Sequence, residues 1–105
     1  MFAECLPGKL AFSDIDGITE VNSKFLIIEW KSYEGDIPTG QRIMFERMTA
    51  SGQFTVFVVN GDAETMVIQS MCVVWNGKVK PWMKCDIGYL KSKITRWAAW
   101  AKMEC

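Results

Sequence analysis

The amino-acid sequence predicts an α/β (α+β) fold, a small mixed central β-sheet with flanking helices. Half of the 105 residues are hydrophobic and 12% are aromatic, which suffices for one globular core. Short β-rich runs and stretches with helical spacing follow in the order strand hairpin, helix, strands, helix. Because no repeat or linker interrupts this order, residues 1–105 are expected to form a single domain.

The first predicted elements are two strands joined by the short polar turn Asn22-Ser23. Two runs rich in apolar and β-branched residues flank this turn, one from Ile18 to Val21 and one from Phe25 to Lys31. If the turn has two residues, antiparallel pairing places Asp16 opposite Glu29, on one face of the hairpin.

A helix is predicted next, over residues 41–50, with Thr39 as its N-cap and Gly52 beyond its end. The residues at helical spacing are Ile43, Met44, Arg47 and Met48. Residues 54–59 are apolar except for Thr55 and predict a central strand. The remaining predictions are a turn at 60–62, one long or two short strands over 65–75, a hairpin turn at Asn76-Gly77, and a helix from Asp86 to about Met103 with Leu90, Ile94, Trp97 and Ala101 on one face.

The composition excludes several classes of protein. The chain has no histidine, which excludes Ser-His-Asp and Cys-His catalysis and zinc sites that use histidine. The four cysteines, at 5, 72, 85 and 105, form no CxxC pair and are expected as free thiols. No signal-peptide pattern and no long apolar run is present, so we expect a cytoplasmic protein with no membrane span. No organic cofactor is expected.

The net charge of zero conceals two oppositely charged parts. Residues 1–66 carry ten acids and five bases, a net charge of minus five, and residues 67–105 carry two acids and seven bases, a net charge of plus five. Such a basic part suits a phosphate-bearing partner. The predicted nucleic-acid contacts are Lys78, Lys80, Lys84, Lys91, Lys93 and Arg96; the alternative is that they form solvated faces of a hairpin and a helix. Trp97 and Trp100 are expected in a core or dimer contact, with stacking on a single strand as the alternative.

The predicted hairpin gathers the residues with the clearest chemistry. Strand alternation places Asp14, Asp16, Glu29 and Lys31 on the same face. Clustered carboxylates suit a hard divalent cation, and a nearby lysine could orient water or stabilise charge on a phosphoryl group. This pattern indicates metal-assisted hydrolysis of a phosphodiester without histidine; the alternative is a solvated strand next to an Asp-rich loop.

The segments SDIDG (13–17) and FLIIEWK (25–31) resemble the PD-(D/E)XK nuclease superfamily, whose core is a hairpin that carries Asp and then (Asp/Glu)-x-Lys. The thirteen positions from Asp16 to Glu29 are similar to the spacing in relatives of Holliday-junction resolvases. The fifteen positions from Asp14 are similar to the VRR-NUC branch, in which the Asp follows a proline, here replaced by Ser13. The resemblance covers roughly residues 10–50.

The resemblance implies a site that includes Asp16, Glu29, Lys31 and Gln41, the last at a position where such relatives recurrently have glutamine. In that site Mg²⁺ or Mn²⁺ would be held by Asp16, Glu29 and the backbone carbonyl of Trp30, with Asp14 as a secondary ligand. Lys31 would position or polarise the attacking water, and Gln41 would touch that lysine or the substrate backbone.

The same resemblance implies a restriction-endonuclease-like core and a Mg²⁺-dependent endonuclease that hydrolyses DNA, with branched or structured DNA as the expected substrate. Resolvase-like relatives are commonly homodimers, and a compact protein of this kind could be encoded by a phage or a mobile element. The alternative is a non-catalytic module with a nuclease-like fold that binds nucleic acid or a partner protein.

Overall fold

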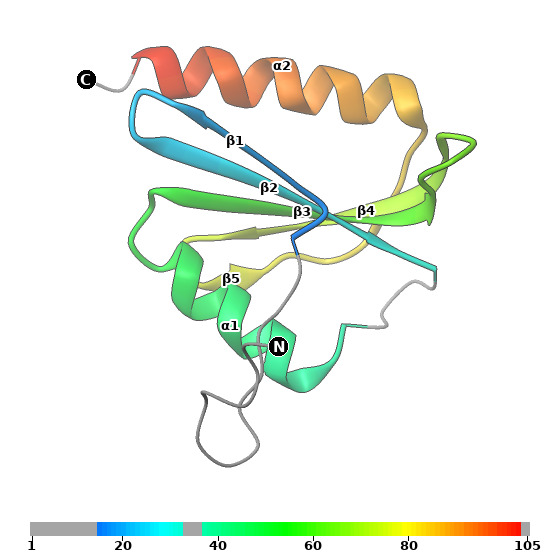
Figure 1. The fold of residues 1–105 in the computed structure, drawn as a ribbon, viewed down its shortest axis with the longest axis horizontal. Helices are drawn as coiled ribbons and strands as arrows, with labels where there is room; N and C mark the ends of the chain where they lie inside the picture. The colour runs from blue at the N-terminus through cyan, green and yellow to red at the C-terminus, as the bar shows by residue number, and fades with distance from the viewer. Residues whose placement is uncertain (1–14, 33–36, 104–105) are drawn as a thin grey trace, which may run out of the picture.

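The computed structural model describes residues 15–32 and 37–103, which form one mixed six-stranded sheet with a helix on each side (Figure 1). The elements are β1 (Gly17–Val21), β2 (Lys24–Lys31), α1 (Thr39–Thr49), β3 (Phe54–Asp62), β4 (Val67–Trp75), β5 (Lys78–Val79), β6 (Met83–Lys84) and α2 (Ile87–Met103). The order across the sheet is β1-β2-β3-β4-β5, and β6 also pairs with β4. The predicted α+β fold with a small mixed sheet is confirmed.

Strands β1 and β2 form the predicted hairpin in the predicted register. Asn22 and Ser23 have φ angles of 53° and 66°, so both turn residues are left-handed, as the tight turns of twisted hairpins require. The pairing runs from Val21 opposite Lys24 to Gly17 opposite Ile28. One step further along this register, Asp16 meets Glu29.

Strands β2 and β3 are parallel, and α1 connects them. Their carboxyl ends therefore lie at the same edge of the sheet, where Lys31 pairs with Asn60. The predicted turn at residues 60–62 is wrong, because these residues continue β3 and pair with β4 across a bulge that follows Asn60. The segment before Asn76 forms one long strand, β4, and the turn at Asn76-Gly77 is confirmed by the Trp75–Lys78 pair.

Helix α1 differs from the prediction at its start, and of the residues predicted at helical spacing Met44 and Met48 pack against the core. Arg42 N donates to the Pro38 carbonyl at 2.9 Å, so Pro38 is the N-cap in place of Thr39, and no side chain of the described residues caps this end. Phe45, 2% exposed, faces the sheet, whereas Ile43 is 39% exposed. Thr49 is also buried, and its hydroxyl donates to the Phe45 carbonyl at 2.8 Å.

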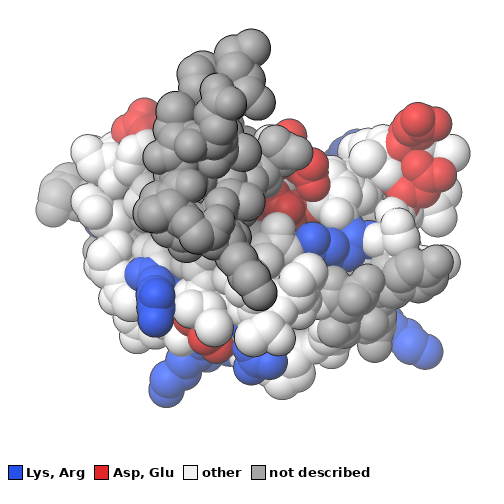
Figure 2. Space-filling view, turned by 60° about the horizontal axis from the view of Figure 1, so that its bottom comes forward, with Lys and Arg blue, Asp and Glu red and all other residues white. Residues whose placement is uncertain are grey.

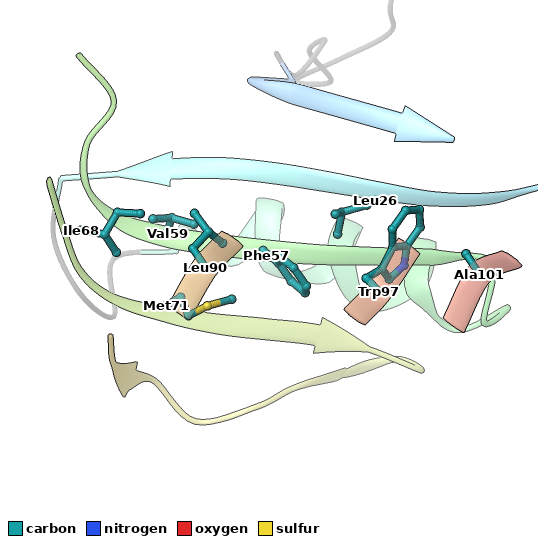
Figure 3. Packing of buried hydrophobic residues seen from close by; sticks show 8 residues of the cluster. All are labelled: Leu26, Phe57, Val59, Ile68, Met71, Leu90, Trp97 and Ala101. Atoms are coloured by element: carbon teal, nitrogen blue, oxygen red, sulfur yellow. The ribbon is translucent and has the colours of Figure 1, made fainter. Parts of the chain in front are cut away.

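Two hydrophobic cores lie on opposite faces of the sheet. Helix α2 covers one core, which consists of Leu26, Phe57, Val59, Ile68, Met71, Leu90, Trp97 and Ala101 (Figure 3). Helix α1 covers the other, which consists of Ile27, Phe45, Val56, Val58, Cys72 and Val74. The predicted cap of α2 is confirmed, because Tyr89 N donates to Asp86 Oδ1 at 2.9 Å.

The two described cysteines are free thiols. Burial raises the pKa of Cys72 to about 11 and also raises the pKa of Cys85. Cys5 and Cys105 lie outside the described residues. Within residues 15–32 and 37–103, neither helix has the length and apolar character needed to cross a membrane.

The bulge in β3 and β4 requires glycine at position 61. A Cβ atom there would lie 2.3 Å from the Val67 carbonyl oxygen, and backbone cannot move away cheaply. We expect Gly61→Ala to lower the free energy of unfolding by about 2–3 kcal/mol in urea denaturation. Gly40→Ala, in the first turn of α1 with nothing within 4 Å of the added methyl, is the control and should be neutral or slightly stabilising. An equal loss in both variants would contradict this role for Gly61.

Candidate functional site

Asp16 and Glu29 meet where the backbone ladder between β1 and β2 ends. Trp30 N donates to Asp16 Oδ2 at 2.8 Å, so the Asp16 carboxylate takes the place of a backbone partner. In return, Asp16 N donates to Glu29 Oε1 at 3.3 Å. These two bonds hold one carboxylate just before β1 and one near the end of β2, at the open end of the hairpin.

The Glu29 side chain lies on the face of the sheet that α1 covers. Its neighbour in β3, Val58, belongs to the core under α1, and Glu29 itself is only 4% exposed. Burial and the nearby Asp16 carboxylate raise the pKa of Glu29, whereas the Asp16 N–H, Lys31 and the Gln41 amide act in the opposite direction. Glu29 is therefore a buried acid beside a second acid, an arrangement that a cation would relieve.

Helix α1 contributes Gln41 to this site from its first turn. Gln41 Nε2 donates to Glu29 Oε2 at 3.2 Å, so both Glu29 oxygens accept a hydrogen bond. The resemblance implies contact with the lysine or the substrate; the structure places this amide on the carboxylate. Gln41 Oε1 is buried and finds no hydrogen-bond partner within the described part of the chain.

Lys31 begins a row of polar residues that crosses four strands. Register places Lys31 beside Asn60, Asn60 beside Ser70, and Ser70 beside Lys84. Directly paired residues share a face of the sheet, and Lys31 is two residues from Glu29 on β2. The whole row therefore lies on the same face as Glu29. Viewed from the side of α1, acidic surface and basic surface adjoin near the middle of the molecule (Figure 2).

Asn60 and Ser70 are members of this row that the sequence prediction missed. They are 5% and 1% exposed, and Asn60 Nδ2 donates to Ser70 Oγ at 3.2 Å. Asn60 Oδ1 has no partner among the described residues and is thus a buried acceptor at the position next to Lys31. The available signal in the sequence was only that Asn60 is the first polar residue after the apolar run of residues 56–59.

The structure separates the predicted nucleic-acid contacts into different places. Lys84 belongs to the polar row, whereas Lys80, Lys93 and Arg96 line a cavity beneath α2, on the other face of the sheet. Lys78 and Lys91 are exposed and do not line that cavity. Asp14 lies outside the described residues. Within residues 15–32 and 37–103, no group of three acidic or cysteine side chains lies close enough together to hold a metal ion. The candidate site there contains two acidic residues, Asp16 and Glu29.

The Glu29 pKa should respond in opposite directions to two neighbouring substitutions. Asp16→Asn removes a negative charge and should lower this pKa, whereas Gln41→Ala removes a donor to the carboxylate and should raise it. A ¹³C NMR titration of the glutamate carboxyl groups, with Glu29 assigned by its loss in Glu29→Gln, measures both. Shifts in the same direction, or no shift, would show that these groups do not act on Glu29 as described.

Comparison of the chain with protein-family models, with curated proteins and with solved structures gives no match.

Proposed function

We propose that this protein is a metal-dependent nuclease of the PD-(D/E)XK type that hydrolyses phosphodiester bonds in DNA. The observation that carries the proposal is the meeting of Asp16 and Glu29 at the open end of one hairpin, two positions before Lys31. The parallel β2–α1–β3 connection brings Gln41 onto the same carboxylate. The mixed sheet with a helix on each face is compatible with a restriction-endonuclease-like core.

The residues present fit a Mg²⁺ or Mn²⁺ ion. The Asp16 and Glu29 carboxylates lie close enough for the charge of Asp16 to raise the pKa of Glu29, and both offer oxygen ligands to a metal ion. Mg²⁺ is commonly held by only one or two carboxylates, with water and substrate phosphate completing its shell. Asp16 and Glu29 would hold the ion together with the Trp30 carbonyl. A bound divalent cation supplies Lewis-acid stabilisation of the charge that develops on the phosphate.

The chain's own residues then have distinct roles. Lys31 would orient the attacking water and stabilise negative charge on the phosphoryl group. Gln41 is a positioning residue that fixes the Glu29 carboxylate through Oε2. Asn60, paired with Lys31 in the sheet, offers a buried acceptor that would restrain the lysine side chain.

The test is cleavage of supercoiled plasmid and of a four-way DNA junction, each with Mg²⁺, with Mn²⁺ and with EDTA. We expect cleavage that requires the divalent cation, and a loss of about a hundredfold or more in Lys31→Ala. Lys102→Ala, an exposed lysine in the last turn of α2, is the matched control and should cleave like wild type.

Two outcomes would contradict the proposal. Wild-type protein that cleaves neither substrate with either cation, yet binds DNA, would favour the non-catalytic binding module. Cleavage that survives in Lys31→Ala would place the reaction elsewhere in the molecule. A panel of linear, nicked and flapped substrates would then identify the preferred DNA structure.

A further inference from the structure

A second site is indicated on the face of the sheet opposite Glu29. A cavity of about 470 Å³ lies there, and its lining residues include Phe57 and Trp97 of the core under α2. By contrast, the β3 neighbour of Glu29 belongs to the core under α1. The cavity is therefore separated from the candidate active site by the thickness of the sheet.

The apolar wall of this cavity is aromatic. Trp75, Trp97 and Trp100 line it together with Phe57. Trp75 and Trp100 meet edge to face, with ring centroids 5.3 Å apart and an interplanar angle of 87°. Both residues are partly exposed, so this corner contributes aromatic surface to the cavity, next to the Lys24 ammonium, which lies 5.9 Å from the centroid of the Trp100 ring.

Apart from Thr55, the polar part of the lining is cationic. Lys80, from the segment after β5, and Lys93 and Arg96, from α2, border the cavity. No acidic residue of the described chain lines it. Such a lining favours a ligand that has more than one negative charge next to a flat apolar group.

We propose that this cavity binds a nucleotide, with the base stacked on the tryptophan surface and the phosphate held by Lys93, Arg96 and Lys80. Aromatic stacking beside basic side chains is the general way in which proteins hold unpaired nucleotides. The cavity has the volume usual for small-molecule sites, about 300–1,000 Å³. A fatty acid, with a single charge and no ring, would leave both the aromatic corner and the second and third cations unused. The nucleotide is either a free nucleoside phosphate or one residue of a single strand.

The test uses the tryptophans as reporters, in EDTA, so that no cleavage interferes and failure of the proposed nuclease activity leaves the result unaffected. Titration with dTMP should shift the indole ¹H–¹⁵N signals of Trp75, Trp97 and Trp100, but not those of Trp30 and Trp82, which do not line the cavity. Thymidine and inorganic phosphate should each bind at least about tenfold more weakly than dTMP, since each lacks one half of the recognition. A six-residue oligothymidylate that binds more tightly than dTMP would assign the site to a single strand, and equal binding would assign it to the free nucleotide.

Substitutions locate the phosphate contact. The double variant Lys93→Gln/Arg96→Gln should weaken dTMP binding by about tenfold or more, whereas Lys91→Gln, exposed on the same helix but outside the lining, should not. Equal affinity for thymidine and dTMP, or indole shifts spread over all five tryptophans, would overturn the proposal. The proposal would also be overturned if the indole signals of Trp75, Trp97 and Trp100 moved with protein concentration alone while the sedimentation coefficient rose. The cavity would then be a contact between copies of the chain.

Discussion

Glu29→Gln should abolish DNA cleavage while leaving the protein at least as stable as wild type at neutral pH. The substitution keeps the size of the side chain and removes its charge. Asp16 N can still donate to the remaining carbonyl oxygen, as it does to Glu29 Oε1. In the wild type, Gln41 Oε1 finds no partner in the described residues. In the variant, Gln41 can rotate its amide so that this oxygen accepts from the new N–H of Gln at position 29.

The expected loss of activity is about a thousandfold or more. A carboxylate that holds a catalytic divalent cation contributes several kcal/mol through that cation, and each 1.4 kcal/mol is about tenfold in rate. The measurement is single-turnover cleavage of supercoiled plasmid with Mg²⁺, accompanied by Mn²⁺ titration calorimetry. Glu64→Gln, an exposed acid in the turn between β3 and β4, is the matched control. Unchanged cleavage in Glu29→Gln would remove Glu29 from the site.

The stability of this variant should depend on pH in a defined direction. Because burial and Asp16 raise the pKa of Glu29, the folded protein binds this proton more tightly than the unfolded chain does. Wild-type stability therefore falls as pH rises from the ordinary glutamate pKa to the raised folded value, and the full loss is present above it. Glu29→Gln lacks this titration, so its advantage in urea denaturation should be present at neutral pH and absent below about pH 4. A variant less stable than wild type at neutral pH would mean that its hydrogen bonds are not kept.

The hairpin part of the site was predictable because its determinants are local. Two polar turn residues fix the register, and period-2 alternation then fixes which side chains share a face. The Asp16–Glu29 meeting therefore follows from counting along residues 16–29, and the structure has the same register.

The rest of the site depends on pairings between distant segments. The tripeptide Asn60-Gly61-Asp62 has the composition typical of a turn. Pairing with β4 overrides this local preference and keeps these residues in β3. The place of Asn60 beside Lys31 requires the parallel β2–β3 pairing, which no local pattern specifies. In the same way, the basic residues of positions 67–105 form one group in the sequence. The sheet nevertheless separates Lys84 from the three cations that line the cavity under α2.

Helix α1 is the element through which packing and the candidate site are coupled. It has 11 residues, too few for a stable helix on its own, so its position depends on contacts with the sheet. Phe45 is its largest buried side chain and packs into the core with Ile27, Val56 and Val58. Gln41 lies one turn before Phe45, so the anchor of the helix also holds the amide on Glu29.

Phe45→Ala should therefore lower the free energy of unfolding by about 3–5 kcal/mol, a large part of the stability of a domain of this size. The melting temperature should fall by roughly 15–25 °C, as followed by circular dichroism. Ile43→Ala, on the exposed side of the same helix, is the matched control and should change unfolding by less than about 1 kcal/mol.

If Phe45→Ala does not fold, Phe45→Leu provides the same test with a smaller cavity and a loss of about 1–2 kcal/mol. Under conditions where Phe45→Leu is fully folded, cleavage should still fall, because a loosened α1 holds Gln41 less firmly on Glu29. Loss of a residue that hydrogen-bonds a metal ligand typically lowers metal affinity or activity by about 10–100-fold, which sets the upper limit of this effect. Full activity in folded Phe45→Leu, combined with full activity in Gln41→Ala, would show that α1 stabilises the fold without positioning the carboxylate.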